Sequence, residues 1–355
     1  MIKEFFRQSK FVISIYYGCR IDCFIAKNGL FGFDKKINNA IDGEFSLGRL
    51  QGVDLAELKK DIKSCYVKYK ALPREYFLFD FIHKTDAERA TYVTDTYINS
   101  TLGRLVGRKY HDEQLNDKYN FYKIMKPYFK RKVIRVRSPK DYNKFEAFAL
   151  DCKSLIIKPN NSSVGNGIFA TIIKNSDDAK NVFSKMMING KSWIVEEMLS
   201  QTEDMAKWNK SSVNTVRVSA FLNKKGFFVL SSVIRTGREG SVIDNAGHGG
   251  ISAAIDVNTG EIISDGMGKD GNWYVCHPDS KIPFKGGAIP CWKELIETVE
   301  KVHKMLPNHI YVGWDFALTP KGWALIEGNW GQLGAQQFAL GHGLKPMFDK
   351  YLSSM

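Results

Sequence analysis

The stretch GWDFALTPKGWALIEGNWG, residues 313–331, reads as two strands joined by a tight turn. Apolar and aromatic residues lie on both sides of Pro320-Lys321-Gly322, which is typical of a three-residue hairpin loop with glycine in the left-handed position. That loop length places Asp315 directly across from Glu327, and the period-two alternation of strands puts Glu327 and Asn329 on one face with Asp315 beside them.

Two carboxylates and an amide are ligands that a hard cation such as Mg²⁺ prefers, and no His or Cys joins them as a zinc site would require. An exposed hairpin whose polar residues face water is the alternative. The apolar residues on both strands favour a buried metal site over that alternative.

Length and composition are those of a globular protein. The chain has 355 residues, of which 44% are hydrophobic and 25% charged, enough for two or three subdomains with a shared core. No apolar run approaches the length that spans a bilayer, so an integral membrane protein is not expected.

The net charge of +13 suits an anionic partner. Lys, Asn and Ile are all abundant, so part of the excess reflects biased residue usage. The sequence contains no helix-turn-helix, zinc-finger or RNA-binding motif, and nucleic acid is therefore not an expected partner. A substrate that carries phosphate or carboxylate groups is a better match than nucleic acid for the positive net charge of the chain.

Six cysteines are scattered without a Cys-x-x-Cys pair, which indicates reduced thiols and a cytoplasmic location. The basic start of the chain precedes a short apolar run, residues 11–17, that lacks the length and cleavage site of a secretory signal. Residues 1–17 either pack on the domain or form a basic, aromatic helix that makes peripheral contact with the inner membrane face.

The first 111 residues hold no catalytic constellation. Helical spacing of apolar residues predicts helices over 54–69, opened by Asp54 as a cap, and over 86–101. The aromatic residues of 76–82 predict a buried helix or connector. We expect a mostly helical amino-terminal domain, 1–111, that binds an acceptor.

The next segment, 112–200, carries the residues expected to bind phosphate. Asp117 is placed to cap a helix over 119–129, with Lys118 beside it, and strands are predicted over 133–136, 154–159 and 168–173. Lys158 ends the second of these strands and would reach phosphate oxygens as a point charge. The small residues of the following loop let backbone N–H groups approach an anion: Ser162, Ser163, Gly165 and Gly167. A flexible hairpin tip is the alternative for this loop.

A strand over 193–199 runs into Glu196-Glu197-Met198-Leu199, and Glu203 follows. Such a strand end presents backbone groups to an adenine edge and a carboxylate to ribose hydroxyls, although an ordinary exposed strand end reads the same way. On the next strand Arg217 alternates with apolar neighbours and is expected to point inward, where a buried arginine needs an anion. The glycine-rich loop 245–251 either lies against substrate, with His248 as a donor, or is a turn.

This order of motifs resembles the ATP-grasp superfamily over roughly residues 112–335, and it is most similar to the sugar-transfer-associated ATP-grasp proteins of bacterial surface-polysaccharide gene clusters. The finer resemblance lies in Asn214-Thr215-x-Arg217, Gly247-x-Gly249-Gly250, His277-Pro278-Asp279 and Ile289-Pro290-x-Trp292. The resemblance implies a fold of the α/β (α+β) class, namely the ATP-grasp fold. Two α+β subdomains, 112–200 and 201–355, would bind ATP between them, and the helical domain would precede them in the chain.

The resemblance also implies cofactors and roles. ATP and two Mg²⁺ ions, for which Mn²⁺ substitutes, are the expected cofactors, with Asp315, Glu327 and Asn329 as metal ligands. Lys118 and Lys158 would bind the α- and β-phosphates, the 162–167 loop would cover the β- and γ-phosphates, and Glu196–Leu199 with Glu203 would hold adenosine. Many ATP-grasp ligases carry an arginine where this chain has Gly331, so Arg217 or Arg235 is expected to hold the anionic intermediate.

The activity implied is an ADP-forming carboxylate–amine ligase that makes an amide on a sugar or surface-polysaccharide precursor through an acylphosphate. A kinase with a hydroxyl acceptor and Asp244 as its base is the second reading, and a non-catalytic ATP-binding protein is the third. The identity of the substrates and the oligomeric state stay open.

Overall fold

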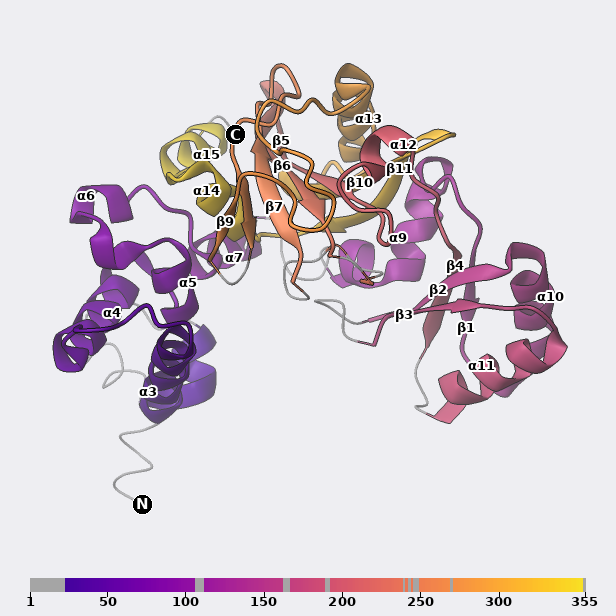
Figure 1. Ribbon diagram of the computed structural model, residues 1–355, viewed down its shortest axis with the longest axis horizontal. Helices are drawn as coiled ribbons and strands as arrows, with labels where there is room; N and C mark the ends of the chain where they lie inside the picture. The colour runs from indigo at the N-terminus through magenta and orange to yellow at the C-terminus, as the bar shows by residue number, and fades with distance from the viewer. Residues whose placement is uncertain are drawn as a thin grey trace. The chain divides into compact units, whose positions relative to one another are not determined.

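The computed structural model describes residues 23–353 except 106–111, 162–166, 189–191, 239, 242–243, 245–248 and 269–270. The chain divides into two compact units. The helical unit combines Met1–Leu105 with Gly331–Ser353, and the sheet unit contains Val106–Trp330 together with Ser354–Met355. Each unit has a hydrophobic core of its own. Figure 1 shows helices alone in the described part of the first unit and both sheets in the second.

The helical unit agrees with the predicted helical start of the chain. Its described helices are α3 Cys23–Ser46, α4 Leu55–Tyr69, α5 Pro73–Leu78, α6 Asp86–Arg89, α7 Asp95–Leu105, α14 Gly334–Leu340 and α15 Lys345–Leu352. Asp54 caps α4 as predicted, because its carboxylate accepts from the N–H groups of Ala56 and Glu57. The aromatic stretch predicted to be buried forms α5 and a 3₁₀ turn, Phe81–His83, within the core.

The single helix predicted over 86–101 is wrong, since the chain forms α6 and α7 with a turn and non-helical residues, 90–94, between them. Thr91, Val93 and Thr94 supply a β-branched run that disfavours helix. The side chain of Gln337 then bonds both backbone groups of Val93, at 2.7 and 2.8 Å. Tertiary contacts therefore decide the break.

Residues 331–353 were predicted to continue the second subdomain but cluster with the helices. Gln337 holds them there through Val93, and the Lys345 N–H donates to the Thr91 carbonyl at 2.7 Å. Gly343 lies so close to Thr91 that a Cβ atom would be 2.1 Å from the Thr91 oxygen, so only glycine fits. These contacts join segments about 250 residues apart.

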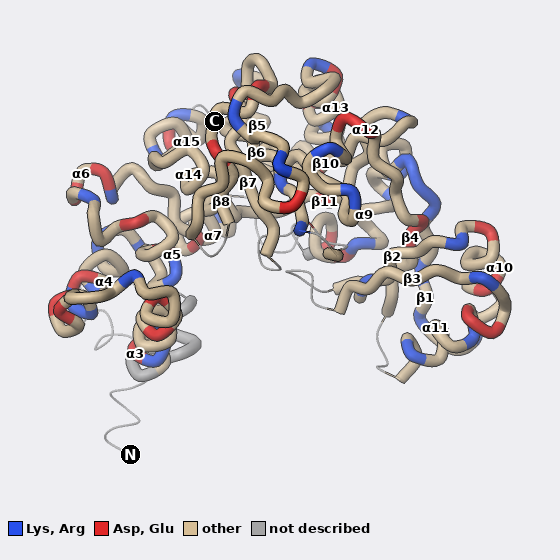
Figure 2. Tube along the Cα trace, in the orientation of Figure 1, with Lys and Arg blue, Asp and Glu red and all other residues tan. Residues whose placement is uncertain are grey.

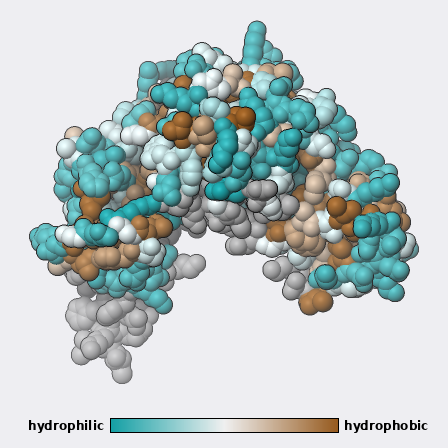
Figure 3. Space-filling model, viewed as in Figure 1, coloured by the Kyte–Doolittle hydropathy of each residue, from teal (hydrophilic) through white to brown (hydrophobic). Residues whose placement is uncertain are grey.

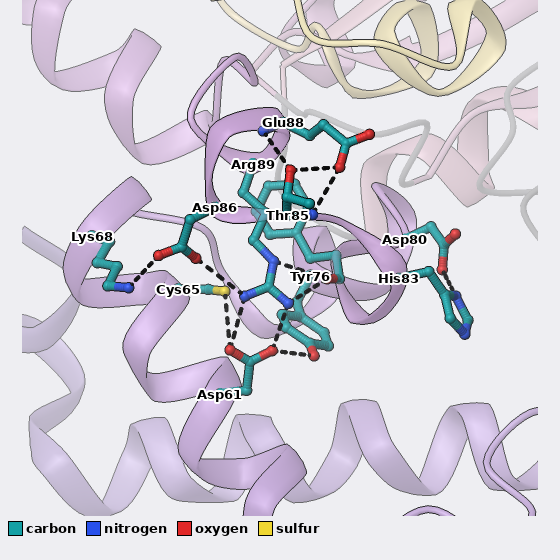
Figure 4. Close-up of polar contacts among 11 residues, drawn as sticks. Asp61, Cys65, Lys68, Tyr76, Asp80, His83, Thr85, Asp86, Glu88 and Arg89 are labelled. Carbon is teal, nitrogen blue, oxygen red and sulfur yellow. Dashed lines mark hydrogen bonds and ion pairs between the residues drawn. The ribbon is translucent and has the colours of Figure 1, made fainter.

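A partly buried ion pair joins α4 and α6 (Figure 4). Arg89 donates to both carboxylate oxygens of Asp61, at 2.9 and 2.8 Å, and to the Phe81 carbonyl. Tyr76 donates to Asp61 at 2.6 Å, and burial with this hydrogen bond raises the pKa of the phenol. The fork of Arg89 pairs both Asp61 oxygens, and only the Arg89 end of the pair is well buried, since the side chains of Arg89 and Asp61 are 11% and 34% exposed.

Glu75 is a buried carboxyl of the same unit, 3% exposed, that accepts from the N–H groups of Leu72 and Asp95 at 2.8 and 2.6 Å. Burial and the nearby Asp95 carboxylate raise its pKa to about 8. Between its ordinary pKa and this value the folded chain holds a proton that the unfolded chain releases, so stability falls as pH rises.

We expect the free energy of unfolding to fall by about 2 kcal/mol or more between pH 5 and 8, since each unit of pKa shift corresponds to about 1.4 kcal/mol. Glu75→Gln should flatten this dependence in urea titrations followed by circular dichroism. Glu57→Gln, at an exposed position of α4, is the matched control and should keep the wild-type slope. An unchanged slope in Glu75→Gln would contradict the assignment.

The sheet unit contains two antiparallel sheets. The smaller has the order β1-β4-β2-β3, with β1 Val133–Val136, β4 Trp193–Glu197, β2 Ser154–Pro159 and β3 Phe169–Ile172. Helices α10 Tyr142–Cys152 and α11 Ser176–Ile188 share its hydrophobic core. The predicted strands are confirmed to within one or two residues, because each alternates or runs continuously apolar between turn residues.

The larger sheet has the order β11-β10-β5-β6-β7-β8-β9. Its strands are β5 Thr215–Asn223, β6 Gly226–Thr236, β7 Ile251–Ile255, β8 Gly266–Gly268, β9 Trp273–Tyr274, β10 Tyr311–Thr319 and β11 Gly322–Asn329. Helices α9 Lys118–Met125 and α13 Trp292–Lys304 bury their apolar faces in the core of this sheet, while α12 is a single turn, Glu203–Ala206. Because the apolar residues of β5 belong to this core, Thr215 and Arg217 lie on the opposite face.

Charged residues of both signs are distributed over both units (Figure 2). The face shown in Figure 3 is mostly hydrophilic, with separate apolar areas. None of the helices in the described ranges has the length and hydropathy needed to cross a membrane.

Candidate functional site

The hairpin of β10 and β11 places Asp315 opposite Glu327, as predicted. The path to this register differs from the prediction. Thr319 pairs with Gly322, so Pro320 and Lys321 alone form the turn, with Gly322 at a φ of 88°. A bulge then inserts one extra residue, Ile326, opposite the bond between Asp315 and Phe316, and restores the pairing.

Asp315 is fully buried and bound by two arginines. Arg217 donates to both of its oxygens, at 2.7 and 2.6 Å, and Arg235 lies 3.1 Å from one of them. Burial alone would raise the pKa of Asp315, but the two guanidinium groups hold it below its ordinary value. The same pair raises the pKa of Arg217 despite its burial. Arg217 thus points to the site, as its spacing on the strand predicted.

Asn329 lies between the two carboxylates of the hairpin. Its Nδ2 donates to Asp315 Oδ2 at 3.2 Å and to Glu327 Oε1 at 3.0 Å. The NH₂ group of Asn329 thus lies between the carboxylates of Asp315 and Glu327 and reduces their repulsion. Rotation of the amide would offer its oxygen instead.

This donor set fits a hard cation: two carboxylates and an amide oxygen. In the described ranges no three His, Cys, Asp or Glu side chains gather for a metal, so the amide of Asn329 has to be the third donor. Glu327 and Asn329 are half-buried and Asp315 is engaged by the arginines. The first two therefore present the accessible ligands, and the metal roles of all three stay predictions.

Lys158 lies at the end of β2 and contacts Glu196 of β4. Its Nζ is 2.5 Å from Glu196 Oε1, while Arg131 Nε donates to Oε2 at 2.7 Å. The side chains are 10%, 6% and 2% exposed, for Lys158, Glu196 and Arg131 in turn. Burial favours a raised pKa at Glu196, but the two cations lower it. Glu196 is thus an ionised, buried group, so the alternative of an ordinary exposed strand end does not hold for it.

Lys118 begins α9, which Asp117 caps as predicted by accepting from the N–H groups of Tyr119 and Asn120. Burial lowers the pKa of Lys118, and the charge of Lys158 acts in the same direction, while Glu327 and Glu196 oppose it. Lys118 therefore lies close enough to interact with charges on both the smaller sheet and the β10–β11 hairpin, which we call the metal hairpin after its predicted ligands.

Asn160, which the sequence did not single out, connects α9 to the end of β2. Its side-chain oxygen accepts from the Tyr119 N–H at 3.0 Å, and its carbonyl from the Lys118 N–H at 3.4 Å. Asn160 is 2% exposed, and its own N–H donates to the Ser192 carbonyl at 2.8 Å. The residue therefore sets the spacing between the two predicted phosphate lysines.

The strand end predicted to bind adenine, residues 196–199, has backbone N–H groups that already donate within the protein. The Glu197 N–H donates to the Lys132 carbonyl at 3.0 Å and the Met198 N–H to the Ser154 carbonyl at 2.9 Å, so these two donors are engaged within the protein. Leu199 is half-buried and Glu203 is exposed at the start of α12. Their predicted contacts with adenine and ribose remain predictions.

Several predicted residues fall outside the described ranges: Ser162, Ser163, Gly165 and His248. Gly167 is described, as an exposed turn residue before β3. Asp244 is buried, and its carboxylate accepts from Thr215 Oγ1 and lies 3.7 Å from Arg235 Nε. Burial raises the pKa of Asp244 although Arg235 and Thr215 act against it.

The site therefore has two halves within the sheet unit. The first half holds two lysines and one carboxylate: Lys118, Lys158 and Glu196. The second half holds the hairpin residues and their two arginines: Asp315, Glu327, Asn329, Arg217 and Arg235. Arg131 was missed because Lys130-Arg131-Lys132 reads as a solvated basic run, and Asn160 because a polar residue after a strand is ordinary. No local pattern marks either one.

Comparison with known proteins identifies the family. Residues 97–351 match the sugar-transfer associated ATP-grasp family. A search of curated proteins finds no match.

Solved structures that resemble the chain include D-alanyl-alanine synthetase A from Vibrio cholerae, at 13% identity and a TM-score of 0.44, over 70% of this chain and 66% of that one. D-alanine–D-alanine ligase from Bacillus anthracis has 13% identity and a TM-score of 0.43, over 73% and 74% of the two chains. The ATP-grasp ligase PsnB with its minimal precursor has 12% identity and a TM-score of 0.43, over 76% and 71%. The chain thus spans slightly less than two thirds of the synthetase.

The family match covers well over half of the chain and includes both sheets and all the described site residues. The protein has the ATP-grasp fold and belongs to the sugar-transfer associated ATP-grasp family.

Proposed function

We propose that the protein is an ATP-dependent, ADP-forming carboxylate–amine ligase that acts on a sugar or surface-polysaccharide precursor. The observation that carries this proposal is the convergence of Lys118, Lys158 and Glu327. Lys118 interacts electrostatically with both of the others, although they belong to different sheets. Two lysines near a carboxylate suit a polyphosphate that binds together with its cation.

The lysines would bind phosphate oxygens and neutralise charge as the γ-phosphate is transferred, which is the main requirement of a phosphoryl transfer. A cation held by Glu327 and Asn329, with Asp315 behind them, would screen the phosphate charges and orient the γ-phosphate. Arg217 and Arg235 are fixed by Asp315 and would position an anionic substrate group at that end of the site.

In the first step a carboxylate oxygen of the substrate attacks the γ-phosphorus, and the bond to the β-phosphate oxygen breaks to leave ADP and an acylphosphate. In the second step an amine attacks the acyl carbon, phosphate leaves, and the nitrogen loses one proton to form the amide. Neither step needs an acid/base pair at the phosphorus, in agreement with a site made of lysines, arginines, carboxylates and amides.

The test is Mg²⁺-dependent ADP release coupled to phosphate detection, with amino acids paired against uronic acids and nucleotide sugars. We expect ADP and free phosphate together only when both a carboxylate and an amine are present, with Mn²⁺ able to replace Mg²⁺. Turnover with either substrate alone, or ATP hydrolysis that ignores both, would contradict ligation.

A kinase with a hydroxyl acceptor is the second candidate. It is favoured by the buried Asp244, whose raised pKa suits a group that takes a proton from a hydroxyl. The same assay separates the two, because a kinase releases ADP without free phosphate and leaves a phosphorylated acceptor for mass spectrometry. The Asp244→Asn variant should then lose phosphorylation, whereas the ligase proposal assigns Asp244 no chemical step.

A further inference from the structure

Arg131 occupies the place where the two sheets of the ATP-grasp unit approach each other. Its Nη1 donates to the carbonyls of Leu325 on β11 and of Phe129, at 2.7 and 3.0 Å. Its Nε donates to Glu196 Oε2 on β4 at 2.7 Å. One buried guanidinium thus connects the hairpin that carries Glu327 to the carboxylate that holds Lys158.

The third nitrogen of this guanidinium has no partner. Among the described residues, Arg131 Nη2 is buried and makes no hydrogen bond. A buried donor without an acceptor is unfavourable, so a state of the protein in which Arg131 Nη2 gains an acceptor would be favoured. In a planar guanidinium Nε and Nη2 share the edge that binds a carboxylate bidentately, and here Nε already binds Glu196.

The oxygen that would complete this fork is Glu196 Oε1, which now contacts Lys158 Nζ at 2.5 Å. The carboxylate is therefore shared between two cations, one of which is predicted to bind nucleotide phosphate. If Lys158 leaves for a phosphate, Glu196 Oε1 is freed and Arg131 Nη2 gains its acceptor. Glu196 then keeps Arg131 as a cationic partner after Lys158 has left.

We propose that Arg131 is a positioning residue that takes over Glu196 when Lys158 transfers its ion pair to the nucleotide. The inference rests on the proposed function only in requiring that Lys158 binds ATP phosphates. It assigns Arg131 no contact with substrate. The role of Arg131 is to lower the free energy needed to separate Lys158 from Glu196. Its hydrogen bond to the Leu325 carbonyl links the β10–β11 hairpin to the same guanidinium group.

The test is the affinity for Mg-ATP, measured by isothermal titration calorimetry on the full chain. In Arg131→Met the carboxylate of Glu196 has only Lys158 as its partner and should retain it, so we expect ATP affinity to fall tenfold or more. Adding Glu196→Gln removes the charge that holds Lys158, and the double variant should recover most of that affinity. A purely structural role for Arg131 would not be rescued by a second change at Glu196.

Lys132→Met is the matched control, because it removes a positive charge from the neighbouring residue, whose Nζ lies 2.6 Å from the exposed Asp151. It should bind ATP as the wild type does. Thermal unfolding of every variant shows whether it is folded. If Arg131→Met does not fold, Arg131→Lys replaces it, with a smaller loss of affinity expected and the same rescue.

Failure of the two proposals is distinguishable. A wild-type protein that binds no Mg-ATP would overturn the proposed function and this inference with it. Wild-type binding together with equal affinities for Arg131→Met and Lys132→Met would overturn the exchange alone. A loss in Arg131→Met that Glu196→Gln does not restore would also overturn it and leave Arg131 a structural residue.

Discussion

Asp315→Ala should lower the free energy of unfolding by about 3–5 kcal/mol, the usual cost of removing one partner from a buried ion pair. The variant leaves Arg217, whose side chain is 9% exposed, without the carboxylate that accepts both of its hydrogen bonds. Arg235 loses a partner as well. The measurement is urea unfolding followed by tryptophan fluorescence, since Trp314 lies next to Asp315 in the same strand.

A second arginine–aspartate pair with two hydrogen bonds, but with more exposed side chains, serves as the control. Arg238 also forms a two-bond pair, with Asp279, at 2.9 Å for each bond, but these side chains are 39% and 21% exposed. Asp279→Ala should cost about 1 kcal/mol or less. Equal effects of the two variants would show that burial does not determine the strength of the Asp315 pair.

Replacing both partners tests the origin of the loss. Asp315→Leu combined with Arg217→Met removes the unpaired charge and should recover most of the stability that Asp315→Ala loses. Because the arginines hold the pKa of Asp315 below its ordinary value, its stabilisation is present at neutral pH. It disappears only as the pH falls through the lowered pKa.

Glu327→Gln should reduce ATP turnover by about 10²–10³-fold, the range typical of losing one electrostatic group at a transferred charge. Glu327 is half-buried, its carboxylate accepts from Asn329, and its charge acts on Lys118. A glutamine keeps the shape and one acceptor oxygen but removes the negative charge that a cation and Lys118 require. The fold should therefore persist while turnover fails.

The measurement is ADP release at saturating ATP as Mg²⁺ is increased, and the variant should need far more Mg²⁺ than the wild type. Glu297→Gln, an exposed position on α13, removes the same charge from the same unit and should leave turnover unchanged. Turnover in Glu327→Gln within threefold of wild type at low Mg²⁺ would remove Glu327 from the metal site.

Local patterns were sufficient for most of the secondary structure. The caps at Asp54 and Asp117 were predicted from residue type and position, because a carboxylate before a helical run satisfies free N–H groups. The helix predicted over 86–101 failed because Gln337, far along the chain, supplies hydrogen bonds that a helix would otherwise make.

The β10–β11 hairpin shows both what local patterns predict and what they miss. Alternation and turn residues predicted Asp315 opposite Glu327, yet the pairing results from a shorter turn and a bulge at Ile326. The inward direction of Arg217 also followed from alternation on its strand. Its partner did not, since Asp315 is 98 residues away and was expected only to bind metal.

The sequence by itself determined the family and the ATP-grasp fold and predicted the residue types of the candidate site, because these depend on periodicity, turn chemistry and the order of motifs along the chain. Only the tertiary structure decided which charges neutralise one another: Asp315 with two arginines, and Glu196 between Lys158 and Arg131. It also decided that the amide of Asn160 connects β2 to α9 and that residues 331–353 cluster with the helical unit. The physical reason is that a buried charge or amide chooses its partner by distance in the folded chain, which spacing in the sequence does not encode.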